Sequence, residues 1–239
     1  MKGFLLSIVA LILTVSLLLL AALFLPALLR KSQAEAVAGA LAPTVILDAG
    51  HGGRDGSATA RDGTPEKELN LDVTLKLAAL LRAAGYHVVL TRDADYALGE
   101  GAPVGKRKQA DLAGRLALMK AQENALFISI HMNTYPGESC RGTQIWYAPA
   151  YETAKTLAAD LQTAVKAHLQ PENHRKVKAA TSAIYLLHRA TCPAILIECG
   201  FLTNPQESAL LCTPDYRMAL ALVIFEAAAK NFQAGTCRN

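Results

Sequence analysis

The amino-acid sequence predicts a single α/β domain with a largely parallel, mixed β-sheet flanked by helices on both faces. Short runs of consecutive apolar residues, typical of strands buried on both sides, alternate along the chain with longer segments of helical periodicity. At 239 residues the chain has room for one such domain and a short appendage. We expect the domain at 44–239, after an apolar segment at 1–31 and a tether at 32–43.

The apolar segment contains no charged side chain between residues 4 and 29. As a helix it would be about 39 Å long, at about 1.5 Å per residue, which is enough to cross a bilayer core of about 30 Å. We therefore predict an N-terminal membrane helix that anchors an exported domain on the outer face of the cytoplasmic membrane. The alternative is a cleaved signal peptide, because small-residue cleavage sites occur between Ala34 and Ala40. The domain would then be secreted.

The first half of the domain shows three strand patterns and two helix patterns. Strands are expected at 44–47, 86–91 and 126–130, and helices at 68–84 and 107–121. The first helix has a single apolar stripe and ends at Gly85; the stripe comprises Leu69, Val73, Leu77, Leu80 and Leu81. The glycine-rich segment 93–106 is expected to be a loop.

The second half continues the alternation. Strands are expected at 144–148, 184–187 and 194–197, and helices at 153–168 and 214–232. No internal repeat or second domain is evident in the sequence. Alternation of this kind is typical of an α/β sheet covered on both faces.

Three of the apolar runs lead to a histidine or a glutamate, either directly or through a short turn. His51 follows the run 45–47 in a turn rich in glycine, His131 follows 126–130, and Glu198 follows 194–197. Parallel strands bring their carboxyl ends to one edge of the sheet, so these side chains are expected to meet there. A catalytic zinc site takes three ligands of these residue types and keeps a fourth position for water. Taken alone, His51 could be a core residue or part of a phosphate-binding loop, although no Gly-Lys-Ser/Thr motif follows its glycines.

Several roles remain open from the residues alone. Glu66 and Glu68 both stand in the first turn of the predicted helix, where either would favour the helix N-terminus. Asp48 is a candidate acceptor for the free ring nitrogen of a metal-bound histidine. Glu198 could be a catalytic carboxylate or a structural partner of an arginine. A Cys199 thiol nucleophile with His131 as its base is a less favoured alternative, because zinc lowers the pKa of its water to about 7.

Composition excludes several other classes of protein. The five cysteines show no CxxC or CxxH spacing, so neither a disulfide framework nor a thiolate zinc site is expected. The net charge of +4 is modest and is not arranged as a basic stripe interleaved with aromatic residues. We therefore expect no nucleic-acid partner.

The motifs closely resemble those of the zinc-dependent N-acetylmuramoyl-L-alanine amidases between about residues 44 and 232. The matching segments are 48–53 (DAGHGG), 66–67 (EK), 129–133 (SIHMN) and 198–204 (ECGFLTN). The resemblance implies one catalytic Zn²⁺ bound by His51, Glu66 and His131, with Glu198 as the catalytic acid/base. It thereby selects Glu66 over Glu68. Two departures affect local geometry, Ala49 for the usual proline and Lys120 for a common asparagine.

One branch of the family, the sporulation amidases, is especially similar. The membrane segment joined directly to the catalytic domain, the segment 106–112 (KRKQADL) and the stretch from 175–178 to 184–186 all resemble it. This resemblance implies action in spore cortex, as a step towards muramic δ-lactam, and an activating lipoprotein as partner.

The expected reaction is hydrolysis of the amide between the lactyl group of N-acetylmuramic acid and L-alanine of the peptidoglycan stem peptide. Asn133, Arg115 and Arg175 are candidate substrate contacts, with Arg107 as a further cation, although Arg115 could instead be a structural partner inside the fold. Segments 93–106 and 168–182 are candidate walls of the substrate groove. The alternatives are a vegetative cell-wall amidase, a zinc peptidase that cuts within the stem peptide, and a non-catalytic wall-binding protein.

Overall fold

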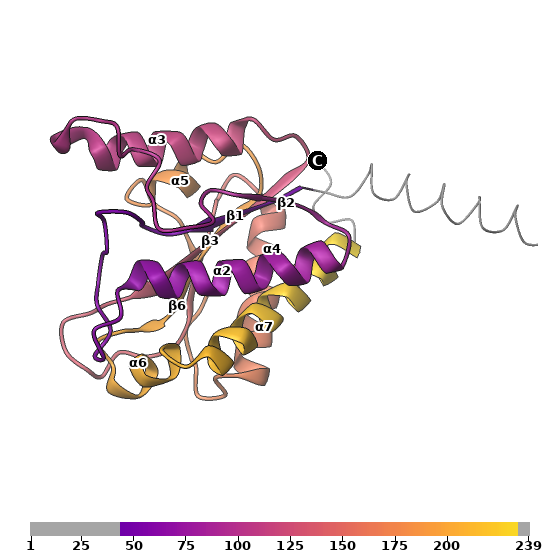
Figure 1. Ribbon diagram of the computed structural model, residues 1–239. Helices are drawn as coiled ribbons and strands as arrows, with labels where there is room; N and C mark the ends of the chain where they lie inside the picture. Colours follow the sequence, from indigo (N-terminus) through magenta and orange to yellow (C-terminus); the bar gives the residue numbers. More distant parts are fainter. Residues whose placement is uncertain (1–43, 234–239) are drawn as a thin grey trace, which may run out of the picture. The chain divides into compact units, whose positions relative to one another are not determined.

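A mixed six-stranded sheet forms the centre of the computed structural model, which describes residues 44–233 (Figure 1). The strands are β1 (Thr44–Ala49), β2 (His87–Leu90), β3 (Ala125–Asn133), β4 (Gln144–Tyr147), β5 (Lys178–Ala179) and β6 (Ala194–Phe201). Their order across the sheet is β2-β1-β3-β6-β4-β5, and only the β4–β6 pair is antiparallel. The predicted mixed, largely parallel α/β sheet is confirmed.

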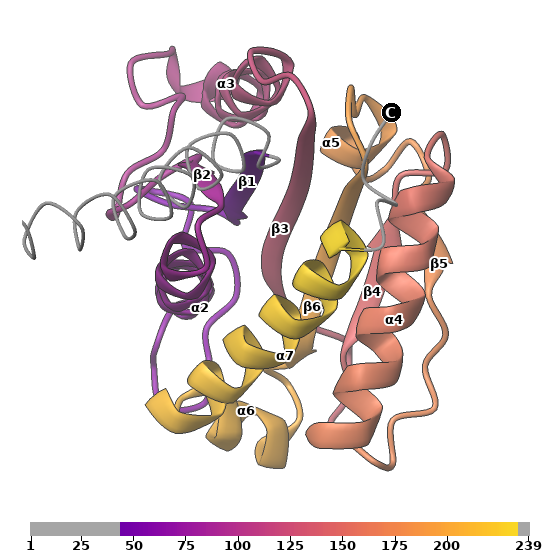
Figure 2. The same ribbon diagram turned by 90° about the vertical axis from the view of Figure 1, so that its right-hand side faces the viewer.

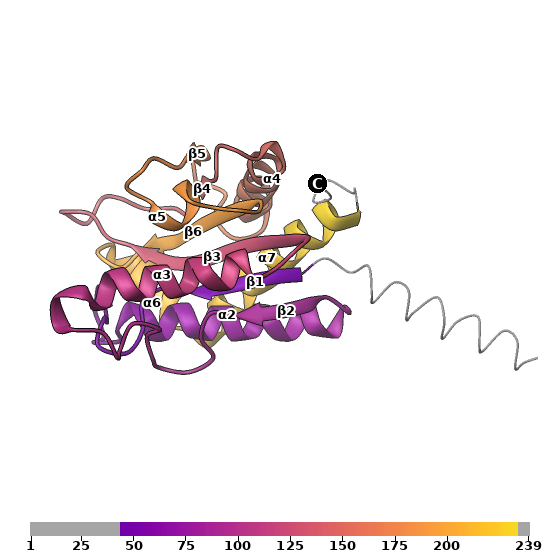
Figure 3. The same ribbon diagram turned by 90° about the horizontal axis from the view of Figure 1, so that it is seen from above.

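Helices cover both faces of the sheet (Figures 2 and 3). One face carries α2 (Glu66–Ala83), α4 (Glu152–His168) and α7 (Pro214–Gln233), and the other carries α3 (Arg107–Lys120) and α5 (Tyr185–His188). Alternate residues of each strand supply the two cores: Val45 and Leu47 pack towards α2, whereas Ile46 packs towards α3. Two shorter elements complete the fold, the 3₁₀ helix η1 (Val104–Lys106) and α6 (Pro205–Leu211).

The predicted strand at 184–187 is wrong, because this segment contains the short helix α5. Leu186 and Leu187 are buried in the core beneath α3. A run of four apolar residues fits a buried strand and a buried helical turn equally well, so periodicity could not separate them. The strand in this part of the chain is instead β5, two exposed residues whose composition gives no strand signal.

Helix α6 is also absent from the sequence-based expectations. Its start is set by Asn204, whose side chain accepts hydrogen bonds from the backbone N–H groups of Gln206 and Glu207, and by Pro205 in the first turn. This cap follows directly on β6. The chain therefore leaves the sheet just after Phe201, at the carboxyl end of β6.

The predicted membrane helix, the tether and the residues after 233 lie outside the described part of the chain. Within residues 44–233, no single helix has the length and apolar composition to cross a membrane. The pair α6 and α7 passes the same test only when taken together, with a bend of 83° between them.

Candidate metal centre

His51, Glu66 and His131 meet beside the ends of β1 and β3. Oε1 of Glu66 lies 3.4 Å from Nε2 of His51 and 3.3 Å from Nδ1 of His131. One ligand atom from each residue falls within 4.8 Å of the others, which is the arrangement of a candidate metal site. Burial opposes ionisation of Glu66, but the hydrogen bonds and charges of the two histidines outweigh it and hold the pKa of the carboxyl well below its usual range. The donor set is therefore one carboxylate and two imidazoles.

Helix α2 places Glu66, and not Glu68, between the histidines. Glu66 is the first residue of the helix and is 2 % exposed, whereas Glu68 is exposed. Oε1 of Glu66 also accepts hydrogen bonds from the backbone N–H of Met132 (3.0 Å) and from Nδ2 of Asn70 (3.3 Å). These bonds fix the carboxylate against β3, so the structure makes the choice that the local sequence left open.

His51 stands in a left-handed turn that aims its ring at Glu66. Its φ is +61°, a conformation that side-chain-bearing residues rarely adopt, and the two glycines after it also have positive φ. Nδ1 of His51 lies 3.0 Å from Oδ2 of Asp55, which orients the ring. Asp55, and not Asp48 as expected, is therefore the acceptor beside the free ring nitrogen of His51. The sequence feature that could have predicted this is the spacing of four residues between His51 and Asp55 within one glycine-rich turn.

Glu198 faces the same site from β6. It is the register partner of His131 on β3, and both side chains line a pocket of about 310 Å³ together with His51. Within residues 44–233, Oε2 of Glu198 is buried and has no hydrogen-bond partner. Burial raises the pKa of Glu198 to about 7. A carboxyl group with this pKa can accept and return a proton near neutral pH.

Cys199 points into the opposite core, because neighbouring residues of a strand face opposite sides of the sheet. Burial raises the pKa of its thiol well above the usual range. A thiolate nucleophile needs exposure and a lowered pKa, so the structure disfavours the alternative that paired Cys199 with His131.

Comparison with known proteins identifies the family of this chain. Residues 45–230 match the Amidase_3 family, described as N-acetylmuramoyl-L-alanine amidase. The germination-specific N-acetylmuramoyl-L-alanine amidase of Bacillus subtilis is 34 % identical over 190 residues, which is 79 % of each chain.

The chain belongs to the Amidase_3 family.

It is therefore an enzyme, an N-acetylmuramoyl-L-alanine amidase, and the family resemblance expected from the motifs is confirmed. Solved structures agree. The CwlD amidase from Clostridioides difficile, solved in complex with the GerS lipoprotein, has a TM-score of 0.76 and 34 % identity over 80 % of this chain and 99 % of its own. The amidase AmiC2 of Nostoc punctiforme has a TM-score of 0.68 and 28 % identity over 80 % of this chain and 97 % of its own.

Two buried arginines hold the backbone of the His51 turn in this amidase. Arg92 donates to the carbonyl groups of Ala49 and Gly50, both at 2.9 Å. Arg115 donates to the carbonyls of Ala49 (2.9 Å) and His51 (2.7 Å), and it forms an ion pair with Asp48. The two guanidinium groups therefore fix three consecutive carbonyls beside a backbone conformation that is intrinsically unfavourable. Nothing in the sequence patterns pointed to Arg92.

Asp48 is fully engaged in this network. Besides Arg115 it accepts hydrogen bonds from Thr91 Oγ1 (2.8 Å) and Ser129 Oγ (2.6 Å). The remaining guanidinium donors of Arg115 go to Asp111. The structure therefore favours a role for Arg115 as a structural partner inside the fold. All of its guanidinium donors are used within the protein and are not available to a substrate.

Replacing Arg115 with methionine is expected to lower the free energy of unfolding by about 3–5 kcal/mol, because Asp48 would be left buried without its counter-ion. Urea unfolding of Arg115→Met measures this, with Arg82→Met, at an exposed position, as control. Adding Asp48→Asn should restore part of the loss. A decrease below about 1 kcal/mol would contradict the structural role.

Gly50 makes room for the His131 ring. A Cβ atom at position 50 would lie 2.6 Å from Nδ1 of His131 and closer still to two other ring atoms. The backbone N–H of Gly50 donates to the carbonyl of Ile130 at 3.0 Å, so the turn cannot move away without losing this bond to β3. The glycine is therefore required by the close approach of the imidazole.

We expect Gly50→Ala to displace His131 and to lower both metal affinity and turnover by at least about 10-fold, as misplaced site residues commonly do. Metal titration and peptidoglycan hydrolysis measure the two effects. Gly101→Ala is the matched control, since a Cβ at that position meets no atom within 4 Å. If Gly50→Ala bound metal as tightly as the wild type, the close approach of the His131 ring would not require glycine at position 50.

The pKa of Glu198 predicts a pH dependence for the metal-free chain. A carboxyl group whose pKa is raised on folding stays protonated in the folded state while it ionises in the unfolded state. The free energy of unfolding should therefore fall between its ordinary pKa of 4.5 and about 7. The loss is about 3 kcal/mol at most. Unfolding measured with a chelator at pH 4.5 and pH 8 should show this loss in the wild type and a smaller one in Glu198→Gln.

The other predicted substrate residues lie away from this pocket. Arg175 stacks over the ring of Phe201, 4.5 Å from its centroid, and donates to the carbonyl of Arg141 at 2.7 Å. Asn133 is half-buried at the end of β3, where its carbonyl accepts the N–H of Leu202 at 2.8 Å. Neither lines the metal pocket. Residues 183–186 form one wall of it, in place of the expected segment 168–182.

Proposed function

We propose that His51, Glu66 and His131 bind one catalytic zinc ion and that Glu198 is the acid/base of amide hydrolysis. Two imidazoles and one carboxylate are the donor types of catalytic zinc sites, and their facing atoms are already close together. A zinc ion bound there would polarise the amide carbonyl and lower the pKa of a water molecule. The unpartnered Oε2 of Glu198 in the same pocket is the observation that carries the proposal.

The protein side chains then have separate roles. Asp55 keeps the His51 ring oriented, and the backbone N–H of Met132 holds Glu66 in place. Glu198 takes a proton from the attacking water and returns it to the amine of the departing L-alanine. Its raised pKa makes both transfers feasible near neutral pH. The bond cleaved joins the lactyl group of N-acetylmuramic acid to the stem peptide.

Mass spectrometry of purified peptidoglycan after incubation with the chain and zinc tests this function. Intact stem peptides that begin with L-alanine, together with free muramoyl glycan, are expected. Shortened stems would indicate the zinc peptidase instead. No cleavage by the wild type, with zinc shown to be bound, would favour the non-catalytic wall-binding protein.

We further propose that the substrate is spore cortex, that the reaction is a step towards muramic δ-lactam, and that a lipoprotein activates the enzyme. Support comes from the similarity to a germination-specific amidase and to an amidase that forms a complex with a lipoprotein. Digestion of cortex and of vegetative wall, each with and without a candidate lipoprotein, separates the two substrates. Faster release from vegetative wall in both conditions would favour a vegetative amidase.

The proposed location is the outer face of the cytoplasmic membrane, with the apolar segment 4–29 as the anchor. N-terminal mass determination on membrane-extracted protein tests it. A mature terminus near Gly39 would instead indicate signal cleavage and a secreted enzyme.

A further inference from the structure

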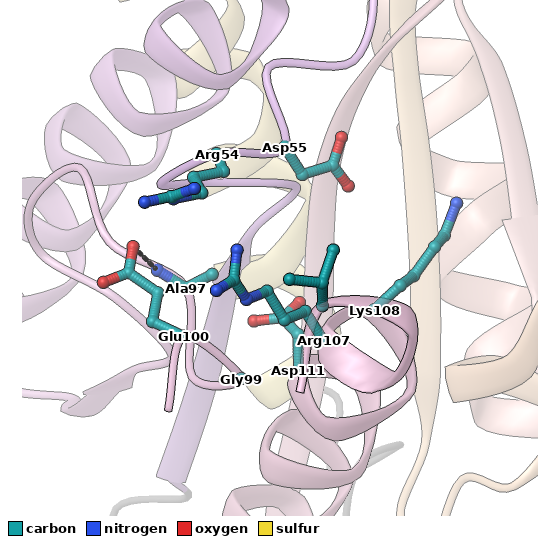
Figure 4. Close-up of a pocket in the computed structure, with 9 residues that line it drawn as sticks. Arg54, Asp55, Ala97, Gly99, Glu100, Arg107, Lys108 and Asp111 are labelled. Atoms are coloured by element: carbon teal, nitrogen blue, oxygen red, sulfur yellow. Dashed lines mark hydrogen bonds between the residues drawn. The ribbon is translucent and has the colours of Figure 1, made fainter. Parts of the chain in front are cut away.

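A second pocket, of about 500 Å³, adjoins the metal centre (Figure 4). The segment 93–106 and the first turn of α3 form one side of it, and the turn at Arg54 and Asp55 forms the other. The two pockets share Asp55, Lys108 and Asp111, so a substrate in the metal pocket can extend into this one. Asp55 is also the residue that orients His51.

Three cationic side chains line this pocket: Arg54, Arg107 and Lys108. Figure 4 shows these side chains around the pocket, with Arg54 on the turn that also carries Asp55, and Arg107 and Lys108 at the start of α3. Within residues 44–233 none of the three cations forms an ion pair with a carboxylate. Within the same residues the one hydrogen bond donated by the Arg107 side chain goes to the backbone carbonyl of Ala102, at 3.2 Å.

The acidic residues of the pocket are already engaged. Asp55 accepts from His51, and Glu100 accepts the backbone N–H of Ala97 at 3.3 Å. Asp111 binds Arg115 and the backbone N–H of Leu98. The charged groups of Arg54, Arg107 and Lys108 therefore have hydrogen-bond donors available for an additional anion. Like charges that line one pocket repel each other, and a bound anion relieves this repulsion.

The side of the pocket formed by segment 93–106 and the first turn of α3 is joined by hydrogen bonds to the turn that carries His51. Asp95 accepts the backbone N–H of Gly53 at 2.8 Å, and Nζ of Lys67 bridges the carbonyl of Gly53 and Asp95, at 2.7 Å each. At the other end Gly99 packs directly on α3, since a Cβ there would lie 2.6 Å from the backbone nitrogen of Asp111. A wall fixed in this way loses little conformational entropy when a ligand binds.

We propose that Arg54 and Arg107, assisted by Lys108, bind a free carboxylate of the stem peptide. The inference rests on the proposed function and names the subsite that receives the peptide. The carboxyl group of muramic acid is consumed in the scissile amide, so the neighbouring glycan offers no charge there, whereas the stem peptide bears free carboxylates. Guanidinium groups bind carboxylates through paired, charge-assisted hydrogen bonds. The peptide therefore extends towards Arg54, and the glycan lies nearer residues 183–186.

Calorimetric titration of the full chain with a stem tripeptide tests the subsite without any turnover. The probes are L-Ala-γ-D-Glu-diamino acid and the same peptide with the α-carboxyl of D-Glu converted to a carboxamide. We expect the free acid to bind about 10-fold more tightly, which corresponds to about 1.4 kcal/mol. In Arg54→Gln/Arg107→Gln this preference should disappear. Arg82→Gln, which removes an exposed charge at the far end of α2, should keep it.

Equal affinities of the wild type for the two peptides would overturn the proposal, as would no detectable binding of either. So would a double variant that loses affinity for both peptides alike. Hydrolysis of a soluble muramoyl peptide gives a separate readout: the double variant should raise KM by about 10-fold and leave kcat unchanged. If the wild type binds the free acid preferentially but releases no stem peptide, the proposed function fails and the carboxylate subsite stands.

Discussion

Glu198→Gln is expected to lower turnover by about 10²–10⁴-fold, the usual contribution of a general acid/base. The glutamine amide keeps the size of the side chain but can neither accept the proton of the attacking water nor return it to the leaving amine. Because Glu198 is not among the three clustered donors, the metal content of the variant should equal that of the wild type. Metal analysis beside peptidoglycan hydrolysis separates the two effects.

The matched control is Glu123→Gln, which makes the same chemical change at an exposed position before β3. It should leave turnover unchanged. If Glu198→Gln retained both a wild-type metal content and full activity, the acid/base role would have to be withdrawn. If it lost zinc as well, Glu198 would have to be counted among the ligands.

His51→Asn should abolish metal binding and reduce turnover at least as strongly, because it removes one of the three proposed ligands. Asparagine is the substitution of choice because it tolerates the left-handed backbone of this position, where φ is +61°. Alanine there would combine loss of the ligand with backbone strain. The stability of the metal-free chain should therefore change little in His51→Asn, while bound metal falls to background.

His174→Asn, at an exposed position, serves as the control and should bind metal normally. Removal of the metal from the wild type with a chelator should reproduce the loss of activity seen in His51→Asn, and added zinc should reverse it in the wild type alone. Stoichiometric metal in His51→Asn would show that this imidazole is not a ligand.

The local sequence was sufficient for five of the six strands, all except β5, and for three of the four residues of the proposed site. Strands β1, β3 and β6 appear as largely apolar runs, because a strand buried on both faces carries mostly apolar side chains. His51, His131 and Glu198 interrupt or follow those runs, and such side chains are costly there without a function. Local sequence could not identify Glu66, because Glu68 stands in the same helical turn and fits the same local pattern.

Tertiary structure alone decided the residues that support the site. Arg92 and Arg115 reach the His51 turn from segments about 40 and 65 positions away, and Asp55, not Asp48, meets the His51 ring. Packing also made Tyr185–His188 a helix where a strand was expected at 184–187, and it placed Arg175 outside the lining of the metal pocket. Strand periodicity reflects the burial of each residue separately and is therefore readable along the chain. Which donor meets which acceptor depends on how distant segments pack together, and no local pattern records that.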